Sequence, residues 1–423
     1  MPYPLNFSEI LEALKNLSFK AMGYSSPNPP VACVITDLEG KILSKAHTQK
    51  TGGNHAEREA YKNFALEFPD CKSIPHLVFV TLEPCTHFGK TPPCIDLILE
   101  YKPSCVYYGL SDPNPLVQKR NGLEECLRAG IEILHSPEIE KISRTFLSGF
   151  ISRIKKKRPQ IFIKTALSKE GFYSDLTKTK ISLSNSKSNQ MTQMLRAKVD
   201  AVLVGPGTVH TDLPSLNFRG FDNSEILSLE KMRTNFKPNM LTENWEYSLT
   251  QSIFENTMTI NSVQFHNTNY KDYQPFRIFV VSCNQLPKDF FFEKQTLLNK
   301  ELQSKKVLFF LLDFEKENPI HEKLYGTLSG ISLEHPVIIS KKEELQRKIF
   351  QKFTDLSLNT VLVEGGNLFY KMFSENLDKN DLVYFIHTDQ SITKGILPAI
   401  NLKDTKKMFE IQLEKNTWEV YGS

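Results

Sequence analysis

The sequence predicts a two-domain α/β protein. Its 423 residues exceed the usual size of a single domain, about 150 residues, and leave room for two unequal domains. Helical and strand patterns alternate along the chain, which is typical of helices packed on a sheet. A basic run at Lys155–Arg158, followed by Pro159, separates two such patterns. We therefore expect one domain over residues 1–150 and a second over residues 158–423.

The first domain begins with an amphipathic pattern and continues with short apolar runs. We expect helices at residues 7–17, 55–68 and 122–129. We expect strands, in apolar runs typical of a buried sheet, at residues 31–36, 77–82 and 105–110. Gly130 follows the third helix and favours a turn into a further strand. This order predicts an α/β sandwich.

The second domain repeats the alternation over a longer stretch. We expect strands at residues 161–165, 201–205, 276–282, 307–312, 337–340 and 360–363. Helical stretches lie between several of them. Residues 220–274 are rich in Asn, Thr, Ser and Lys and break the rhythm, so we interpret them as an insertion or a long surface excursion.

Composition excludes several classes of function. The net charge of +4 is the difference between 52 basic and 48 acidic residues and gives no general attraction to nucleic acid. The sequence contains no apolar run long enough to span a membrane, and its N-terminus does not resemble a signal peptide. Seven cysteines, an odd number at low density, argue against a disulfide scaffold and favour a cytoplasmic location.

The strongest functional signal is His55-Ala56-Glu57, followed by Cys85 and, after eight intervening residues, Cys94. A catalytic zinc ion takes three protein ligands and keeps its fourth position for water. His55, Cys85 and Cys94 supply three nitrogen and thiolate ligands. Glu57 is then placed to take a proton from that water and pass it to a leaving amine.

Local structure must bring these groups together. Residues two apart do not share a face in mid-helix, so we expect His55 at the very start of a helix, capped by Asn54. Two prolines before Cys94 favour a helix start there, where the helix dipole stabilises a thiolate. His87 stands near enough in sequence to be a fourth ligand, which would make the site a closed, structural one. A non-catalytic, zinc-stabilised interaction protein is therefore a remaining alternative.

The HxE and paired-cysteine arrangement resembles the cytidine-deaminase-like superfamily. The wide cysteine spacing looks like the deaminase domain of the bifunctional riboflavin-biosynthesis proteins, the RibD/RibG family. Ser26-Pro-Asn-Pro29, His47 and Asp112-Pro-Asn-Pro115 agree with this family's order. The resemblance implies zinc-dependent deamination of 2,5-diamino-6-ribosylamino-4(3H)-pyrimidinone 5′-phosphate. It also implies that three residues contact this substrate, namely Asn28, His47 and Lys90.

Residues 158–423 resemble the family's reductase domain, which has a dihydrofolate-reductase-like fold. The resemblance rests on three stretches, Lys164–Gly171, Val204–Arg219 and Val363–Asn367. It implies NADPH-dependent reduction of the ribosyl chain to ribityl. The residues implied to line NADPH are Ala166, Thr208, Asp212, Ser282 and the loop beginning at Gly366. Those implied to line the substrate are Leu216, Glu364, and Arg196 and Arg219, the last two as bidentate forks on its phosphate.

The second domain also departs from the family pattern. Glu170 stands where the family usually has Asp, Ser182–Asn185 replaces a string that begins with Trp, and Leu213 replaces a frequent Asp or Asn. One alternative is therefore a deaminase with a degenerate reductase domain, and another is a nucleic-acid base deaminase. A preference for NADPH over NADH follows from the resemblance alone. The expected partner is a small phosphorylated pyrimidine, neither nucleic acid nor membrane, and a homo-oligomer is left open.

Overall fold

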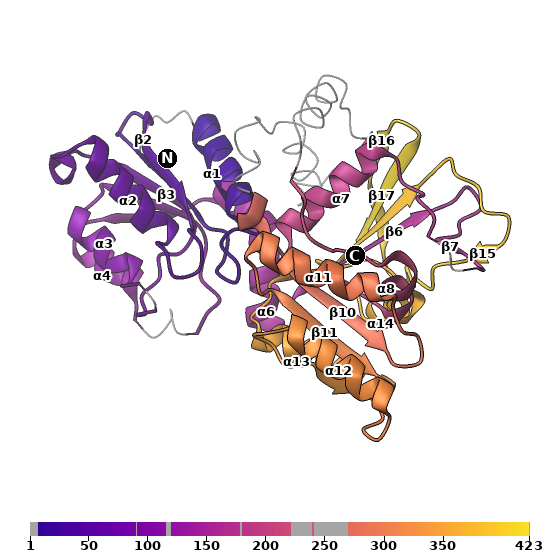
Figure 1. The fold of residues 1–423 in the computed structure, drawn as a ribbon. Helices are drawn as coiled ribbons and strands as arrows, with labels where there is room; N and C mark the ends of the chain where they lie inside the picture. Colours follow the sequence, from indigo (N-terminus) through magenta and orange to yellow (C-terminus); the bar gives the residue numbers. More distant parts are fainter. Residues whose placement is uncertain are drawn as a thin grey trace. The chain divides into compact units, whose positions relative to one another are not determined.

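The computed structural model describes residues 7–89, 91–115, 120–177, 180–220, 239–240 and 270–422. These residues form two compact units (Figure 1). Unit 1 contains the described residues up to Lys157, and unit 2 contains those from Arg158 onward. No helix in the described ranges is both long enough and apolar enough to cross a membrane.

Unit 1 is built on a five-stranded sheet in the order β2-β1-β3-β4-β5. β1 pairs antiparallel with both β2 and β3, whereas β3, β4 and β5 are parallel. The carboxyl ends of β3 and β4 therefore meet at one edge of the sheet. The strands are β1 (Ala32–Thr36), β2 (Ile42–His47), β3 (Leu77–Leu82), β4 (Cys105–Leu110) and β5 (Glu132–His135).

Helices cover both faces of this sheet. The helices are α1 (Phe7–Ala21), α2 (Ala56–Glu67), α3 (Cys94–Tyr101), α4 (Gly122–Arg128), α5 (Pro137–Phe146) and α6 (Ser148–Lys156). Alternate residues of β1 point to opposite sides. Ala32 and Val34 join an apolar cluster with α1 and α5, whereas Cys33 and Ile35 join a second cluster with α2, α3 and α6. Unit 1 is an α/β/α sandwich, as the sequence predicted.

Unit 2 contains a ten-stranded sheet in the order β12-β11-β10-β8-β13-β6-β14-β17-β16-β9. The strands from β12 to β14 are parallel, and those from β14 to β9 are antiparallel. Its strands are β6 (Gln160–Leu167), β8 (Ala201–Val204), β9 (Asn239–Met240), β10 (Phe276–Ser282), β11 (Val307–Leu312), β12 (Ile338–Ser340), β13 (Thr360–Val363), β14 (Leu382–His387), β16 (Lys406–Leu413) and β17 (Asn416–Gly422). A separate pair is formed by β7 (Ser174–Asp175) and β15 (Gly395–Ile396).

The helices of unit 2 also pack on both faces of its sheet (Figure 1). They are α7 (Ser186–Lys198), α8 (Pro206–Asp212), α11 (Asp289–Leu302), α12 (Pro319–Ile331), α13 (Lys342–Asp355) and α14 (Asn367–Ser374). The inner faces of α13 and α14 join the alternate strand residues that include Ile161 and Ile163 in one core. On α11, Phe291 packs against Phe279 and Phe309 of β10 and β11.

The sequence located most of the central elements but not all of the sheet. The predicted strands at residues 276–282, 307–312 and 360–363 agree with β10, β11 and β13. Strands β2, β14, β16 and β17 were not predicted. Most of the expected excursion at residues 220–274 lies outside the described residues.

Leu213 ends α8 in the left-handed backbone region, with φ at 48°. This region is costly for a branched side chain and easier for Asn or Asp, the residue types that the family pattern favours here. We expect Leu213→Asn to stabilise unit 2 by about 0.5–1 kcal/mol in chemical denaturation. The same change at Leu297, which is exposed on helical α11, should destabilise it by a few tenths of a kcal/mol. If both substitutions changed the free energy of unfolding in the same direction, the backbone at Leu213 would not be strained.

Candidate active sites of the two units

In unit 1, three side chains from separate elements converge on one point. His55 is the N-cap residue of α2, Cys85 follows β3, and Cys94 is the first residue of α3. His55 Nδ1 lies 3.4 Å from Cys85 Sγ and 3.5 Å from Cys94 Sγ, and all three ligand atoms lie within 4.8 Å of one another. Tetrahedral zinc with ordinary Zn–N and Zn–S bonds separates such atoms by about 3.6 Å. The three residues therefore fit one zinc ion.

The start of α2 differs in one detail from the expectation. His55 does occupy the helix start, but Asn54 does not cap the helix. The Asn54 amide donates instead to the carboxylate of Glu59, at 2.8 Å. The expectation of an Asn54 cap was wrong because the N-cap position is His55, one residue further along the chain. The backbone still turns at His55, so His55 and Glu57 both face inward.

The first turn of α3 contacts Cys85, whose sulfur accepts a backbone hydrogen bond there. The Cys94 backbone N–H donates to Cys85 Sγ at 3.4 Å, and the Ile95 N–H donates to the Cys85 carbonyl at 3.1 Å. Helix N-termini favour negative charge, so this arrangement suits thiolate ligands. The contacts with Cys94 and His55 lower the pKa of Cys85 to about 4 despite its burial.

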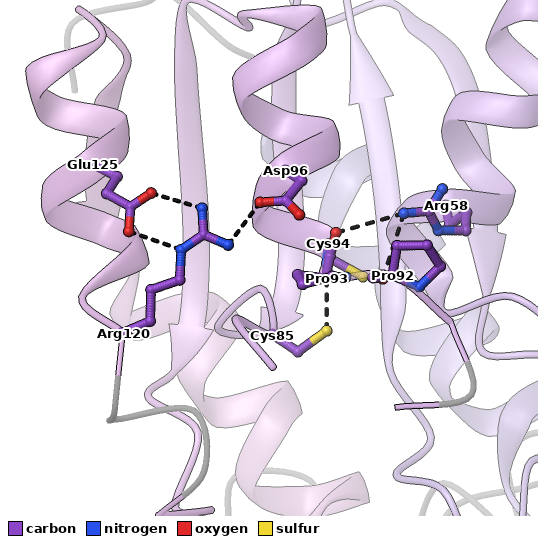
Figure 2. A network of polar contacts seen from close by, with 8 residues as sticks. All are labelled: Arg58, Cys85, Pro92, Pro93, Cys94, Asp96, Arg120 and Glu125. Atoms are coloured by element: carbon purple, nitrogen blue, oxygen red, sulfur yellow. Dashed lines mark hydrogen bonds and ion pairs between the residues drawn. The ribbon is translucent and has the colours of Figure 1, made fainter. Parts of the chain in front are cut away.

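Two arginines hold the segment that delivers Cys94 (Figure 2). Arg58, from α2, reaches the carbonyl oxygens of the two prolines before Cys94, at 3.4 and 3.5 Å. Arg120 binds Glu125 of α4 with two nitrogens, at 2.8 and 2.7 Å, and Asp96 of α3 with its third, at 2.7 Å. Contacts from α2 and α4 thus fix the start of α3 from two sides.

Glu57 lies beside the three candidate ligands and is only 3% exposed. Burial, reinforced by the negative Cys85, raises the pKa of Glu57 to about 7. A carboxyl group with such a pKa can both accept and release a proton near neutral pH.

A cavity of about 750 Å³, which includes space open to solvent, lies over the candidate ligands. His55, Glu57, Cys85 and the expected substrate residue Asn28 all line it. His47 is not among its lining residues. It lies at the end of β2, where its Nδ1 contacts the Thr48 carbonyl at 3.0 Å.

Two further expectations concern the loop between the cysteines. Lys90 lies outside the described residues. His87 lines the cavity but does not join the candidate ligand group, which among the described residues consists of His55, Cys85 and Cys94. The geometry thus gives no support to a closed site with His87 as fourth ligand.

Two acidic residues in the cavity were not assigned from the sequence. Glu83 follows β3 and Asp112 follows β4, and the Asp112 N–H donates to the Glu83 carboxylate at 3.1 Å. Burial raises the pKa of Glu83, and burial with the nearby Glu83 charge raises that of Asp112 to about 6. Parallel strands that end side by side are the signal that could have found this pair.

In unit 2, the expected substrate residues Arg196 and Glu364 bind each other. Glu364 follows β13, and its carboxylate accepts from Arg196 Nε at 2.6 Å and from Nη2 at 3.0 Å. Lys164 of β6 lies 3.6 Å from the same carboxylate. Burial alone would raise the pKa of Glu364, but the two cations outweigh it and lower the pKa to about 2. The fork of Arg196 therefore faces a carboxylate of its own chain.

Two glycines after β13 allow the start of α14 to lie close to α8. Gly365 and Gly366 have φ values of 120° and 90°. A Cβ on Gly365 would lie only 2.6 Å from Thr208 Oγ1. Gly366, at the N-cap of α14, is partly exposed and carries no side chain, which suits the approach of a pyrophosphate.

The remaining expected nucleotide residues occupy ends of neighbouring elements. Ala166 lies on β6, and Asp212 ends α8, where burial raises its pKa against the opposing charges of Lys180 and Lys164. Ser282 ends β10 and donates to Asp313 at 2.6 Å.

The expected substrate residues Leu216 and Arg219 lie in the segment after α8. Leu216 is buried, whereas Arg219 is exposed and its backbone N–H donates to Gln193 of α7 at 3.0 Å.

The departures from the family pattern have structural roles of their own. Glu170 accepts from the Ile392 N–H and the Ser168 hydroxyl, each at 2.8 Å, and these bonds lower its pKa to about 2. Asn185 caps α7 by accepting from the Ser188 N–H at 2.9 Å. Both substitutions are accommodated by the local hydrogen bonding.

Comparison with known proteins agrees with both halves of this structure. Residues 8–110 match the family model of the cytidine and deoxycytidylate deaminase zinc-binding region, and residues 159–377 match that of the RibD C-terminal domain. Solved structures support the fold over 98% of each chain. The deaminase/reductase of Thermotoga maritima gives a TM-score of 0.68 at 23% identity, and Acinetobacter baumannii RibD gives 0.69 at 20%.

Curated relatives carry the name riboflavin biosynthesis protein RibD. The protein of Aquifex aeolicus is 37% identical over 204 residues, 48% of this chain and 55% of the relative. That of Escherichia coli is 33% identical over 196 residues, 46% of this chain and 50% of the relative. The chain thus spans about half the length of the curated relatives it matches.

By fold, the chain joins a cytidine-deaminase-like unit to a dihydrofolate-reductase-like unit, which confirms the predicted fold class. The RibD C-terminal domain model covers just over half of its residues. The chain belongs to the RibD family, and the resemblance stated from its motifs is confirmed. Because both family models match, neither a deaminase with a degenerate reductase domain nor a nucleic-acid base deaminase is favoured.

Proposed function

We propose that the chain is a bifunctional enzyme of riboflavin biosynthesis. Unit 1 deaminates 2,5-diamino-6-ribosylamino-4(3H)-pyrimidinone 5′-phosphate, and unit 2 reduces the ribosyl chain of the product to ribityl with NADPH. The observation that carries the proposal is the convergence of His55, Cys85 and Cys94, next to a cavity that His55, Cys85 and Glu57 line. The domains assigned are residues 1–150 for deamination and residues 158–423 for reduction, with the excursion at 220–274 inside the second.

For deamination, His55, Cys85 and Cys94 would hold zinc, whose Lewis acidity makes water a nucleophile near neutral pH. Glu57 accepts a proton at its carboxylate and delivers it to the departing amine. The Asn28 amide, which carries a donor and an acceptor, suits the edge of the pyrimidine ring. We assign His47 and Lys90 to substrate binding on the family motif alone.

For reduction, the accessible backbone at Gly366 and the adjacent Thr208 would hold NADPH, which supplies the hydride. We assign the nucleotide pocket to the ends of the surrounding elements, represented by Ala166, Asp212 and Ser282. The substrate is assigned to the segment that carries Leu216 and Arg219 and to the pair of Arg196 with Glu364.

The proposed partner is a small phosphorylated pyrimidine rather than nucleic acid. We place the enzyme in the cytoplasm, in line with seven cysteines that are all buried and form no disulfide. A homo-oligomer is part of the proposal only as an open expectation.

A coupled assay on the diaminopyrimidine phosphate tests the proposal by following ammonia and NADPH together. We expect ammonia release first and NADPH oxidation only after it. Ammonia without NADPH oxidation would limit the function to deamination. Activity on RNA or DNA bases, with none on the pyrimidine phosphate, would overturn the proposal.

Metal removal separates the two activities. After treatment with a zinc chelator, we expect ammonia release to fall to background, because His55, Cys85 and Cys94 then lack the ion they hold. Reduction of a chemically deaminated substrate should continue at its former rate. Hydrogen exchange should speed up at the start of α3, since ligand binding stabilises a fold by a few kcal/mol. Added zinc should restore both ammonia release and the slow hydrogen exchange of α3. Deamination that resists the chelator would contradict the assignment of zinc to this site.

A further inference from the structure

Helix α6 forms one wall of the cavity over the candidate zinc ligands. Phe150, Arg153 and Ile154 line this cavity, and their spacing of three and four positions places them on one face of the helix. All three lie beyond the stretch that matches the deaminase family model, and Arg153 and Ile154 lie beyond residue 150, where the first domain was expected to end. The walls of the cavity therefore include a helix that the family model does not cover.

Arg153 joins this helix to the segment that carries Asn28. Its Nη2 donates to the carbonyl oxygen of Pro27 at 3.4 Å, although the two residues are 126 positions apart in the sequence. Its guanidinium carbon lies 5.5 Å from the centre of the Phe150 ring, a cation–π contact within the helix. The side chain of Arg153 is thus held between its own helix and the segment before β1.

The segment before β1 has few backbone donors with which to fix its own position. Pro27 and Pro29 carry no N–H, so each offers only its carbonyl oxygen. The Asn28 N–H donates to the Ser25 carbonyl at 3.0 Å, which closes one turn. The position of this turn against the helix therefore depends on side-chain donors such as Arg153.

We propose that Arg153 is a positioning residue of the deaminase, which holds the Asn28 amide at the edge of the cavity by binding the neighbouring Pro27 carbonyl. This inference rests on the proposed function and deepens it, because it adds a residue outside the family motifs to the pyrimidine site. An amide must meet a ring edge with its donor and acceptor both in line, so a small rotation of the backbone at Asn28 would misplace both groups. A guanidinium suits this task, because it stays charged and offers several donors in a rigid plane.

Arg153→Met removes the donors but keeps an unbranched stem that can pack on Phe150. For this variant we expect KM of deamination to rise about 10-fold, because binding of the ring edge is weakened. Since proton transfer is untouched, kcat should stay within about 2-fold of wild type, and the zinc content should not change. Arg153→Lys retains a charged donor and should recover most of the affinity. Lys155→Met is the matched control, since Lys155 is exposed on the same helix, and it should behave as wild type.

A double-mutant cycle separates a positioning role from direct contact with the substrate. If Arg153 acts through Asn28, Arg153→Met should change KM by less than about 2-fold in a chain that already carries Asn28→Ala. An equally large rise of KM in both backgrounds would overturn the proposal. So would a rise that disappears with the dephosphorylated pyrimidine, because Arg153 would then bind the phosphate itself. A fall in zinc content would mean that Arg153 only supports the fold.

Hydrogen exchange tests the same contact without a substrate. The Asn28 backbone amide should exchange about 5–10-fold faster in Arg153→Met than in wild type or in Lys155→Met, because the turn loses its anchor on the helix. If the wild-type chain releases no ammonia from the diaminopyrimidine phosphate but shows this difference in exchange, the proposed deamination fails while the positioning role stands. If the chain deaminates and neither KM nor exchange differs between the variants, the positioning role fails alone.

Discussion

Glu57→Gln is expected to lower the rate of ammonia release by about 10²–10⁴-fold. The amide has nearly the same shape as the carboxyl group, so the cavity and the ligand triad should persist. It cannot accept a proton, which removes the transfer from water to the leaving amine. Ammonia release on the diaminopyrimidine phosphate measures the effect, and zinc content by atomic absorption should stay at the wild-type level.

Glu59→Gln is the matched control, since Glu59 lies on the same helix and binds Asn54 and Lys62 rather than the triad. It should release ammonia at close to the wild-type rate. Reduction of the deaminated substrate should be unchanged in both variants. A Glu57→Gln protein that keeps its zinc and still deaminates would disprove the role given to Glu57.

Glu364→Gln is expected to destabilise unit 2 by about 3 kcal/mol and to abolish NADPH oxidation. The Glu364 side chain is 8% exposed, and its removal leaves Arg196 and Lys164, only 14% and 15% exposed, without their counter-charge. Breaking such a pair costs more than the pair itself contributes, because the remaining charges stay desolvated. Urea denaturation of the full chain, followed by hydrogen exchange in unit 2, measures the loss.

The stability that Glu364 contributes should depend on pH in a definite direction. The folded-state pKa of Glu364 is about 2, below the usual value of 4.5. Its stabilising effect is therefore fully present above about pH 4.5 and is lost as the pH falls toward 2. The stability gap between wild type and Glu364→Gln should narrow over the same range. Glu375→Gln, which breaks an exposed pair with Lys371, should show almost no gap at any pH, and an equal gap for both would contradict the buried-pair argument.

The sequence predicted the central strands well because buried parallel strands are continuous apolar runs. Val307–Leu312 is an example in which all six residues are buried. Strand β16 was not predicted. Its apolar residues alternate with charged ones such as Lys407 and Glu410, and this alternation is a weaker indication of a strand over a short span. Pairing partners far apart in sequence, such as β6 with β14, leave no local trace at all.

The candidate metal site was predictable because its ligand types and spacing are unusual together. The pairing of Arg196 with Glu364 was not, since the two residues are 168 positions apart and each alone is suited to a substrate. The Glu83–Asp112 contact could have been predicted, because each residue follows one of two adjacent parallel strands.

The place of β6 in its sheet has a consequence for synthesis on the ribosome. β6 is the first strand of unit 2, yet both of its neighbours, β13 and β14, come from the last quarter of the chain. Unit 1 pairs its strands among residues 32–135 and can complete its sheet while translation continues. The emerging β6 has neither neighbour until about residue 363 has left the exit tunnel, and it gains the second only after about residue 387. A nascent chain stalled before the first of these points should therefore hold a folded first unit followed by protease-sensitive polypeptide.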